Sequence, residues 1–407
     1  MKLARLLPAF AAGAILTACG GGGTTTTTNV TVPSDLSISS FTADFSYMAK
    51  LKDLTAAGKG KVGVILPDTT SSVRYVQFDQ PYLQKAFQQA GYKSSDFTIT
   101  NAQGQEAQEL AQAQTAITNG ATVLIMDPLN STVGSQIQTL AQQKGVKVIS
   151  YDRATFTGTN TYYVSFDNVQ VGELIGKGFV QCVSDWGVKN AQVFELDGGQ
   201  NSDPNAVSFA QGYNDAIWGK KVAKVDAGTT NTQGMKLVNE QVATDWKNDV
   251  GQTIFQQAYT ANAAINATVE ANDGLGNAVV TVLKSKGVKA KSVPTTGQDA
   301  TPDGIANTLT DYQCGSVYKA VYLEAQAAVA LATVLRASAT PPPALVNGTT
   351  APPSPVAGST QQPAILLVPI WVNKANIKDT VIKDNFVDKA ALCQKVTAAV
   401  CTAAGIS

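Results

Sequence analysis

The 407-residue sequence contains no histidine. This absence excludes acid–base catalysis by an imidazole and every metal site that needs a His ligand. Charged residues make up only 15% of the chain, with 30 basic and 30 acidic residues and no cluster of Lys and Arg, so we do not expect nucleic-acid binding. There is also no Gly-x-Ser-x-Gly motif and no phosphate-binding loop, which argues against the common hydrolase and nucleotide-dependent enzymes.

Long apolar runs are absent except near the N-terminus. The first five residues carry two cations, and an apolar run from residue 6 to 16 follows, too short for a stable membrane span. The run ends in Leu-Thr-Ala-Cys, with the cysteine at position 19, which is the pattern of a bacterial lipobox. We therefore predict a lipoprotein signal peptide over residues 1–18 and a diacylated Cys19 that anchors the exported protein to the outer face of the cytoplasmic membrane. An ordinary signal peptide that happens to contain a cysteine is the alternative.

A stretch of Gly and Thr follows Cys19. It cannot bury apolar area, so residues 19–57 are predicted to be the lipid anchor and a flexible tether. Residues 41–56 have some helical pattern, and part of that segment could pack on the protein surface. No stretch after the signal peptide reaches 18 apolar residues, so no further membrane span is expected.

From residue 61 the sequence alternates strand-like and helix-like segments. Continuous apolar runs occur at 61–66, 122–126 and 146–150, and amphipathic segments lie between one run and the next. This pattern predicts βαβ units and a parallel sheet covered on both faces. The pattern restarts at residues 162–166, which indicates a second doubly wound domain, with strands expected at 191–195, 221–225, 264–269 and 292–296.

The fold class predicted is therefore α/β, with two doubly wound Rossmann-like domains. The domain assignment is residues 58–167 with 318–338 for the N-terminal α/β domain, 168–317 with 364–407 for the C-terminal α/β domain, and 339–363 for an exposed Pro-rich loop. A late strand at 365–372, after the long loop, suggests that the chain crosses between the domains more than once.

Five cysteines are present, of which Cys19 is assigned to the lipid. The remaining four are an even number in an oxidising compartment. Cys393 and Cys401 lie eight residues apart and can close a small loop. Cys182 and Cys314 would then form the second disulfide, with two buried free thiols as the alternative for that pair.

Polar side chains recur at the C-terminal ends of the predicted strands, at Asp68, Asp127, Asp152 and Arg153. Ligands of open α/β sheets bind outside those ends. A sugar offers hydroxyl groups around its rim and two apolar faces, so its site needs planar hydrogen-bonding side chains and aromatic rings. These residue types at the strand ends favour such a ligand.

Five short blocks, in this order and each at a predicted strand end, resemble the type I periplasmic sugar-binding proteins of ABC transporters, with the greatest likeness to the D-xylose-binding group. The blocks are Tyr151-Asp152-Arg153; Ser165-Phe166-Asp167-Asn168 followed by Val171-Gly172-Glu173-Leu174; Asn272-Asp273; Gly297-Gln298-Asp299-Ala300; and Val317-Tyr318-Lys319. The resemblance covers residues 61–386. It implies two domains joined by a three-crossover hinge, which close on a sugar and present it to a permease. The first loop is less charged than is usual in the xylose group, and the Pro-rich insert and the C-terminal extension are additions.

The resemblance also implies the ligand-binding residues. They are Asp68, Arg74, Tyr75, Asp152, Arg153, Asn168, Asn205, Trp246, Asp273, Gln298, Asp299 and Lys319. Tyr75 and Trp246 would stack on the sugar, Arg74 would donate to its oxygens, and Asp273 would accept paired hydrogen bonds from neighbouring hydroxyls. Asp152 and Arg153 would form the main polar grip of the N-terminal domain. The structural alternatives are an ion pair for Asp152 with Arg153, a helix cap for Asn168 and a loop cap for Asp273.

The function expected is that of an extracytoplasmic binding protein, not an enzyme, without cofactor or metal. Its partners would be a monosaccharide (a xylose-like pentose or a related hexose), an ABC permease and the membrane through the Cys19 lipid, and it would be a monomer. A glycosidase with paired carboxylates fits less well, because the prominent acids lie beside Arg or Asn. A sugar-dependent transcription regulator is rejected, because the signal peptide and tether occupy the place of a DNA-binding domain. The same fold with a nucleoside, autoinducer or amino-acid ligand, or serving a sensory receptor, stays open.

Overall fold

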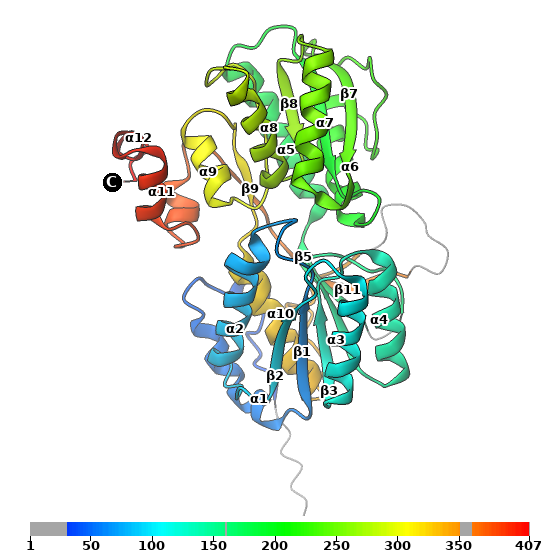
Figure 1. The fold of residues 1–407 in the computed structure, drawn as a ribbon. Helices are drawn as coiled ribbons and strands as arrows, with labels where there is room; N and C mark the ends of the chain where they lie inside the picture. Colours follow the sequence, from blue (N-terminus) through cyan, green and yellow to red (C-terminus); the bar gives the residue numbers. More distant parts are fainter. Residues whose placement is uncertain (1–30, 159–160, 351–359, 407) are drawn as a thin grey trace, which may run out of the picture.

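Two α/β domains lie one above the other in the computed structural model, which describes residues 31–158, 161–350 and 360–406 (Figure 1). The domains are in contact along a narrow junction, where several chain segments pass from one to the other. The predicted signal peptide and the lipid-bearing Cys19 fall in residues 1–30, outside the described residues. Within the described ranges, every helix is too short or too polar to cross a bilayer.

The N-terminal domain is built on a seven-stranded sheet in the order β10-β11-β5-β4-β3-β1-β2. Its parallel strands are β1 (Lys61–Leu66), β2 (Phe97–Asn101), β3 (Ala121–Met126), β4 (Lys147–Tyr151), β5 (Thr161–Phe166) and β11 (Gln362–Leu367), while β10 (Gly348–Thr350) is antiparallel at the edge. Side chains alternate along β1, so Val64 packs in the core shared with α2 (Gln80–Gln89) and α10 (Val321–Arg336). Ile65 packs on the opposite face, with α3 (Glu106–Thr118) and α4 (Ser131–Gln143). Both faces are covered, as the continuous apolar strands predicted.

The C-terminal domain has a smaller parallel sheet in the order β7-β6-β8. Its strands are β6 (Gln192–Gly198), β7 (Lys236–Ala243) and β8 (Ala267–Glu270), and its helices are α5 (Asn168–Asp185), α6 (Pro204–Trp218), α7 (Asn248–Ala261), α8 (Asp273–Ser285) and α9 (Pro302–Leu309). The strand expected at 221–225 is not formed, and Val222 there is exposed. The strand that follows α6 is instead β7, whose half-polar sequence did not indicate a strand. The strand expected at 292–296 is not formed either. That segment follows β8, but Pro294 has no N–H and Thr296 bonds Glu270 partly through its side chain, so no regular ladder results.

Three crossovers connect the domains. The first runs from β5 into α5, the second from β9 (Ser316–Tyr318) into α10, and the third from β11 to β12 (Ile370–Val372), which pairs antiparallel with β9. The assignment of all of residues 364–407 to the C-terminal domain is therefore wrong, because β11 belongs to the N-terminal sheet. Pro369 divides the single strand expected at 365–372, since it cannot donate a ladder hydrogen bond. The Pro-rich loop at 339–363 likewise contains β10 and the first two residues of β11.

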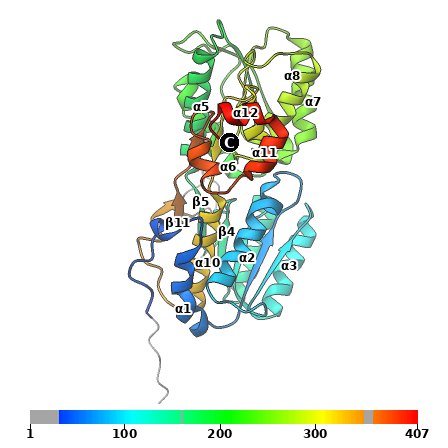
Figure 2. The ribbon, with the colours of Figure 1, turned by 90° about the vertical axis from the view of Figure 1, so that its left-hand side faces the viewer.

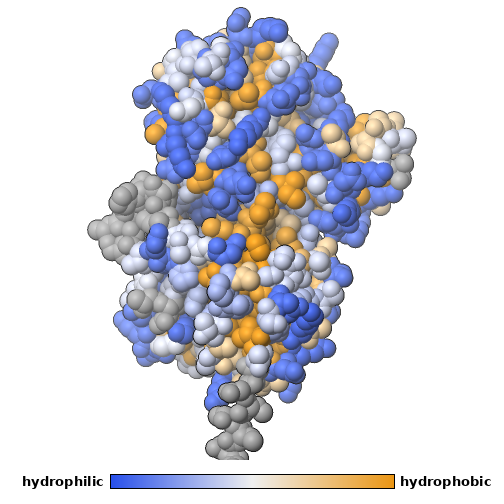
Figure 3. Space-filling model, turned by 180° about the vertical axis from the view of Figure 1, so that it is seen from behind, coloured by the Kyte–Doolittle hydropathy of each residue, from blue (hydrophilic) through white to orange (hydrophobic). Residues whose placement is uncertain are grey.

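The third crossover is unusually apolar on its outside. Val368 and Ile370 are 64% and 44% exposed and are two of the five exposed large hydrophobic residues among those described. Viewed from behind, apolar side chains form a broken line down the middle of the molecule and across the junction of the domains (Figure 3). The hinge region is therefore less polar than the outer surfaces of either domain.

Residues 31–57 do not behave as the flexible tether that the sequence suggested. They form η2 (Ser46–Leu51) and α1 (Lys52–Ala57), which pack against α10. Leu36, Phe45 and Leu51 are fully buried, and the ring of Phe45 packs against Tyr82 of α2. The prediction of a tether as far as residue 57 is therefore wrong. The helical pattern at 41–56 was the correct signal, because it places apolar side chains on one face.

Both cysteine pairs considered in the sequence are bonded in the structure. Cys182 of α5 is joined to Cys314 in the loop before β9, with 5.8 Å between their Cα atoms. Cys393 and Cys401 join α11 (Lys389–Val396) to α12 (Ala398–Ala403). These two helices lie beside the second domain, with α11 packed on α9 (Figure 2). The first disulfide thus joins α5, which follows the first crossover, to the loop that precedes the second crossover.

Candidate functional site

A small cavity lies between the two domains, at the C-terminal ends of both sheets. Its lining residues are Ser71, Ser72, Arg74, Tyr75, Asp152 and Arg153 from the N-terminal domain, Lys319 from the second crossover, and Asp203, Asn205, Phe209, Trp246, Asn272, Gln298 and Asp299 from the C-terminal domain. Nine of the twelve predicted ligand residues are among them. The cavity volume is about 20 Å³, which is room for one water molecule. The domains therefore have to separate before a ligand of sugar size can enter.

Arg74 is held by carboxylates on three sides. It follows the first strand–helix loop and is 1% exposed. Its Nε and Nη2 donate to Asp79 at 2.9 and 2.7 Å, its Nη2 also donates to Glu324 at 2.8 Å, and its Nη1 donates to Asp152 at 2.7 Å. Four of the five guanidinium N–H groups are thus occupied within the protein, and one on Nη1 is left. Arg74 was predicted to donate to the oxygens of the ligand, but only this one N–H group remains for that role. The main effect of Arg74 in this conformation is to orient Asp152.

Asp152 is the centre of the polar network. Its Oδ1 accepts from Arg74 and from the Lys319 ammonium at 3.2 Å, and Tyr75 donates to its Oδ2 at 3.4 Å. Burial alone would raise the pKa of Asp152, but the charges of Arg74, Lys319 and Arg153 lower it below its ordinary value. Asp152 is therefore an ionised acceptor at neutral pH. Lys319 also lies 3.4 Å from Asp299 of the other domain, so it bridges acids on both sides of the cavity.

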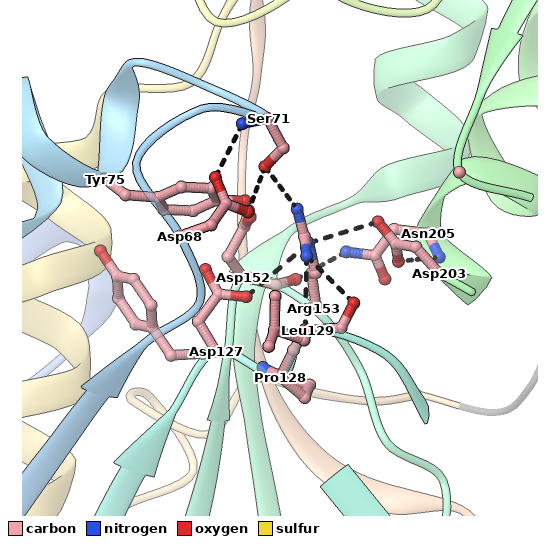
Figure 4. A network of polar contacts seen from close by, with 12 residues as sticks. Asp68, Ser71, Tyr75, Asp127, Pro128, Leu129, Asp152, Arg153, Asp203 and Asn205 are labelled. Carbon is pink, nitrogen blue, oxygen red and sulfur yellow. Dashed lines mark hydrogen bonds and ion pairs between the residues drawn. The ribbon is translucent and has the colours of Figure 1, made fainter. Parts of the chain in front are cut away.

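Arg153 lies at the centre of a second network of polar contacts (Figure 4). Its guanidinium carbon lies 5.5 Å from the centroid of the Tyr75 ring. Its Nη2 donates to Ser71 Oγ at 3.2 Å, and its Nη1 donates to the carbonyl oxygens of Pro128 and Leu129. Its Nε lies 3.7 Å from Asp203 and 3.9 Å from Asp127. Burial raises the pKa of Asp127 well above its ordinary value.

Three aromatic rings line the cavity. Tyr75 comes from the N-terminal domain, and Phe209 and Trp246 come from the C-terminal domain, packed edge to face with ring centroids 6.2 Å apart. The indole N–H donates to Asp203 at 3.1 Å, which fixes the orientation of the ring. A Cβ on Gly198 would lie 2.0 Å from the indole, so the glycine at the end of β6 is needed to admit it. Flat apolar faces on both sides of a polar cavity suit a ring with C–H faces.

The domains also contact each other directly at this point. Ser72 donates to Asp299 at 3.1 Å, and the Asn205 amide donates to the backbone oxygen of Asp152 at 2.6 Å. Arg74, Arg153 and Lys319 balance Asp152, Asp203 and Asp299 in formal charge among the lining residues. The site is therefore closed and neutral overall, with its hydrogen-bonding groups contributed by both domains.

Three predicted ligand residues do not line the cavity. Asp68 accepts from Ser71 N–H and Oγ and shapes the first loop, and Asn168 donates to the Tyr163 hydroxyl at 2.8 Å. Asp273 faces away, toward α9. Its two oxygens accept from the groups Thr301 N and Oγ1, Gln313 Nε2 and Ser316 Oγ. Burial raises the pKa of Asp273 to about 7. The prediction that Asp273 receives paired ligand hydroxyls is therefore not met in this conformation, and its neighbour Asn272 lines the cavity instead.

Five lining residues were not selected from the sequence: Ser71, Ser72, Asp203, Phe209 and Asn272. Phe209 had a usable signal, because it lies four residues after Asn205 on the same face of α6. Asp203 caps that helix and accepts a hydrogen bond from the Asn205 N–H. The sequence position explains this capping role but gives no sign that Asp203 also accepts from Trp246. The two serines belong to the loop that was identified through Asp68 and Arg74.

A cavity enclosed between two α/β domains that are joined by three crossovers is typical of a type I periplasmic binding protein. The chain belongs to the family described as the periplasmic binding protein domain, whose model matches residues 62–338. The family is one of periplasmic binding proteins, so the predicted fold class and the prediction of a non-enzymatic binding protein are confirmed.

Individual relatives agree with this assignment. The D-xylose-binding periplasmic protein of Escherichia coli K12 is 34% identical over 293 residues, which cover 71% of this chain and 80% of that protein. The multiple sugar-binding periplasmic protein SbpA of Azospirillum brasilense is 28% identical and covers 86% of this chain and 99% of its own length. A carbohydrate transporter solute-binding protein of Chloroflexus aurantiacus, solved in complex with D-glucose, superposes with a TM-score of 0.67 at 25% identity, covering 81% of this chain and 97% of that one. The predicted resemblance to the D-xylose-binding group is thereby confirmed.

Proposed function

We propose that the protein captures a monosaccharide, a xylose-like pentose or a related hexose, between its two domains and delivers it to an ABC permease. The observation that carries this proposal is the cavity itself, in which planar polar side chains and aromatic rings from both domains converge. The domains open about the three crossovers, the sugar replaces their direct contacts, and closure gives the permease a shape that reports a loaded protein. The relatives named for D-xylose and for multiple sugars support the choice of ligand.

A panel of ligands tests this proposal. D-Xylose or a related sugar is expected to raise the melting temperature of the purified protein, because a ligand that binds only the folded state stabilises it by about 2.7 kcal/mol at 100 times its Kd. Asp299→Asn should weaken the binding at least tenfold, since it removes a charged acceptor from the cavity. Lys177→Ala, on the exposed side of α5, is the matched control and should leave binding unchanged. A response to nucleosides or amino acids, with none to sugars, would refute the sugar assignment.

The lipid anchor is a separate proposal that rests on the sequence around Cys19. We expect cells fed with radiolabelled palmitate to label the wild-type protein, and the label to be lost in Cys19→Ser, because diacylation requires the thiol. The protein would then be exported and held at the outer face of the cytoplasmic membrane. Equal labelling of the wild type and the variant would exclude Cys19 as the acylated residue.

A further inference from the structure

A second and larger cavity lies between the domains, next to the first. Its volume is about 370 Å³, which is within the range of small-molecule sites. One wall includes Glu106 and Asn130 of the N-terminal domain, and the other includes Asp245, Lys247 and Asp249 of the C-terminal domain. These side chains are mostly exposed, so the cavity is open to solvent. We call it the mouth cavity, in distinction from the inner cavity described above.

The two cavities share part of their lining. Ser71, Arg153 and Trp246 line both of them. These three side chains form the partition between the two cavities. Arg153 Nη2 donates a hydrogen bond to Ser71 Oγ at 3.2 Å, and the indole N–H of Trp246 donates to Asp203. Arg153 and Ser71 meet in Figure 4 at this partition. When the domains separate, a ligand in the inner cavity therefore has a direct path into the mouth, along the indole of Trp246.

The mouth cavity has the chemistry of a sugar subsite. The Asn130 amide donates to Glu106 Oε1 at 2.7 Å, so an amide and a carboxylate already lie side by side on one wall. On the facing wall, Asp245 lies 3.5 Å from the Lys247 ammonium, with 45% and 59% of their side chains exposed. Planar acceptors and mobile donors of this kind match pairs of hydroxyl groups, and Trp246 offers an apolar face.

The charge of the mouth cavity narrows the class of ligand. Its acids Asp68, Glu106, Asp245 and Asp249 outnumber its cations Arg153 and Lys247. An excess of carboxylates disfavours a sugar acid or a sugar phosphate, because like charges would come together as the domains close. A neutral unit rich in hydroxyl groups meets no such penalty.

We propose that the mouth cavity is a second sugar subsite, so that the protein also takes a neutral disaccharide or glycoside. This inference rests on the proposed function. The first sugar residue would occupy the inner cavity, and the second would pass beside Arg153 and along Trp246 into the mouth. Arg153 and Trp246 then contact both residues, while Glu106 and Asp249 contact only the outer one. The glycosidic bond is bound and is not cleaved.

Calorimetric titration with matched sugars tests this proposal. D-Xylose is compared with xylobiose and methyl β-D-xylopyranoside, and D-glucose with cellobiose and maltose. At least one disaccharide is expected to bind as tightly as its monosaccharide or more tightly. Asp249→Ala should weaken that disaccharide about threefold to tenfold and change the affinity for the monosaccharide less than about twofold, because one hydrogen bond to the outer residue is lost. Asp226→Ala, an exposed carboxylate of the same domain outside both cavities, should change neither affinity.

The failures of the two proposals can be told apart. If monosaccharides bind and every disaccharide fails, the mouth subsite is refuted and the proposed function stands. If Asp249→Ala weakens the monosaccharide and the disaccharide equally, the mouth is not a separate subsite and the inference is again overturned. If no sugar of the panel binds, the proposed function fails and the inference fails with it.

Discussion

Asp152→Asn is expected to destabilise the protein by about 3–5 kcal/mol and to abolish sugar binding. The carboxylate of Asp152 accepts from Arg74 at 2.7 Å and from Lys319 at 3.2 Å, and all three side chains are buried. Removing one member of a buried ion network leaves the other charges without compensation, which is the source of this cost. An amide of the same shape preserves packing, so the loss reports charge and not volume.

Urea unfolding and calorimetric titration measure the two effects. The matched control is Asp311→Asn, which breaks the Lys374–Asp311 pair at 3.0 Å, where 43% and 26% of the side chains are exposed. A solvent-exposed pair contributes about 0–1 kcal/mol, so this variant should be nearly as stable as the wild type. Equal effects of the two substitutions would contradict the central role of Asp152. Normal sugar affinity in Asp152→Asn would remove it from the site.

The meeting of Asp152, Lys319 and Asp299 could be predicted from the sequence. Asp152 follows β4 of a parallel sheet, whose strands end at one edge, and Lys319 follows β9. Asp299 follows a segment that was predicted to be a strand but does not form one. In the second domain, Asn205 follows β6 and Trp246 follows β7, and both line the same cavity. The strand before Trp246 was not predicted, so the order of predicted strands and helices accounts for only part of the site. The residue-level pattern of the family then selected which polar side chains to place there.

Long-range pairing limited the rest of the prediction. Arg74 is partnered by Glu324, 250 residues away, and no local pattern announces that its donors are mostly used within the protein. Asp273 is a similar case, since Ser316 and Gln313 satisfy it from a distant segment and turn it away from the cavity. The strand β7 was equally hard to predict, because the sequence of an edge strand with many polar residues resembles that of a loop. The local sequence thus located the edge of the sheet, and tertiary contacts determine which side chains face the cavity.

The protein is expected to be several kcal/mol more stable at pH 5 than at pH 9. Burial raises the pKa of Glu109, Glu195 and Glu270 to about 8 and that of Asp273 to about 7. In the unfolded chain these groups lose their protons near pH 4. Between the two pKa values the folded state holds more protons, so the free energy of unfolding falls as the pH rises from about 4 to about 8. Asp152 acts in the opposite direction, because its pKa is lowered, but its contribution is lost only below about pH 4.

Glu270 allows this dependence to be assigned to one residue. Its Oε2 accepts the Thr296 N–H at 2.7 Å, and its Oε1 has no hydrogen-bond partner among the described residues, so the neutral form is favoured in the interior. Glu270→Gln mimics that neutral form and should flatten part of the decline in melting temperature between pH 5 and 9. Glu173→Gln, which alters a partly exposed pair with Lys177, should keep the wild-type slope. A wild-type melting temperature that rises with pH over this range would refute the argument, because carboxyls buried in their protonated form can only lose stability as they ionise.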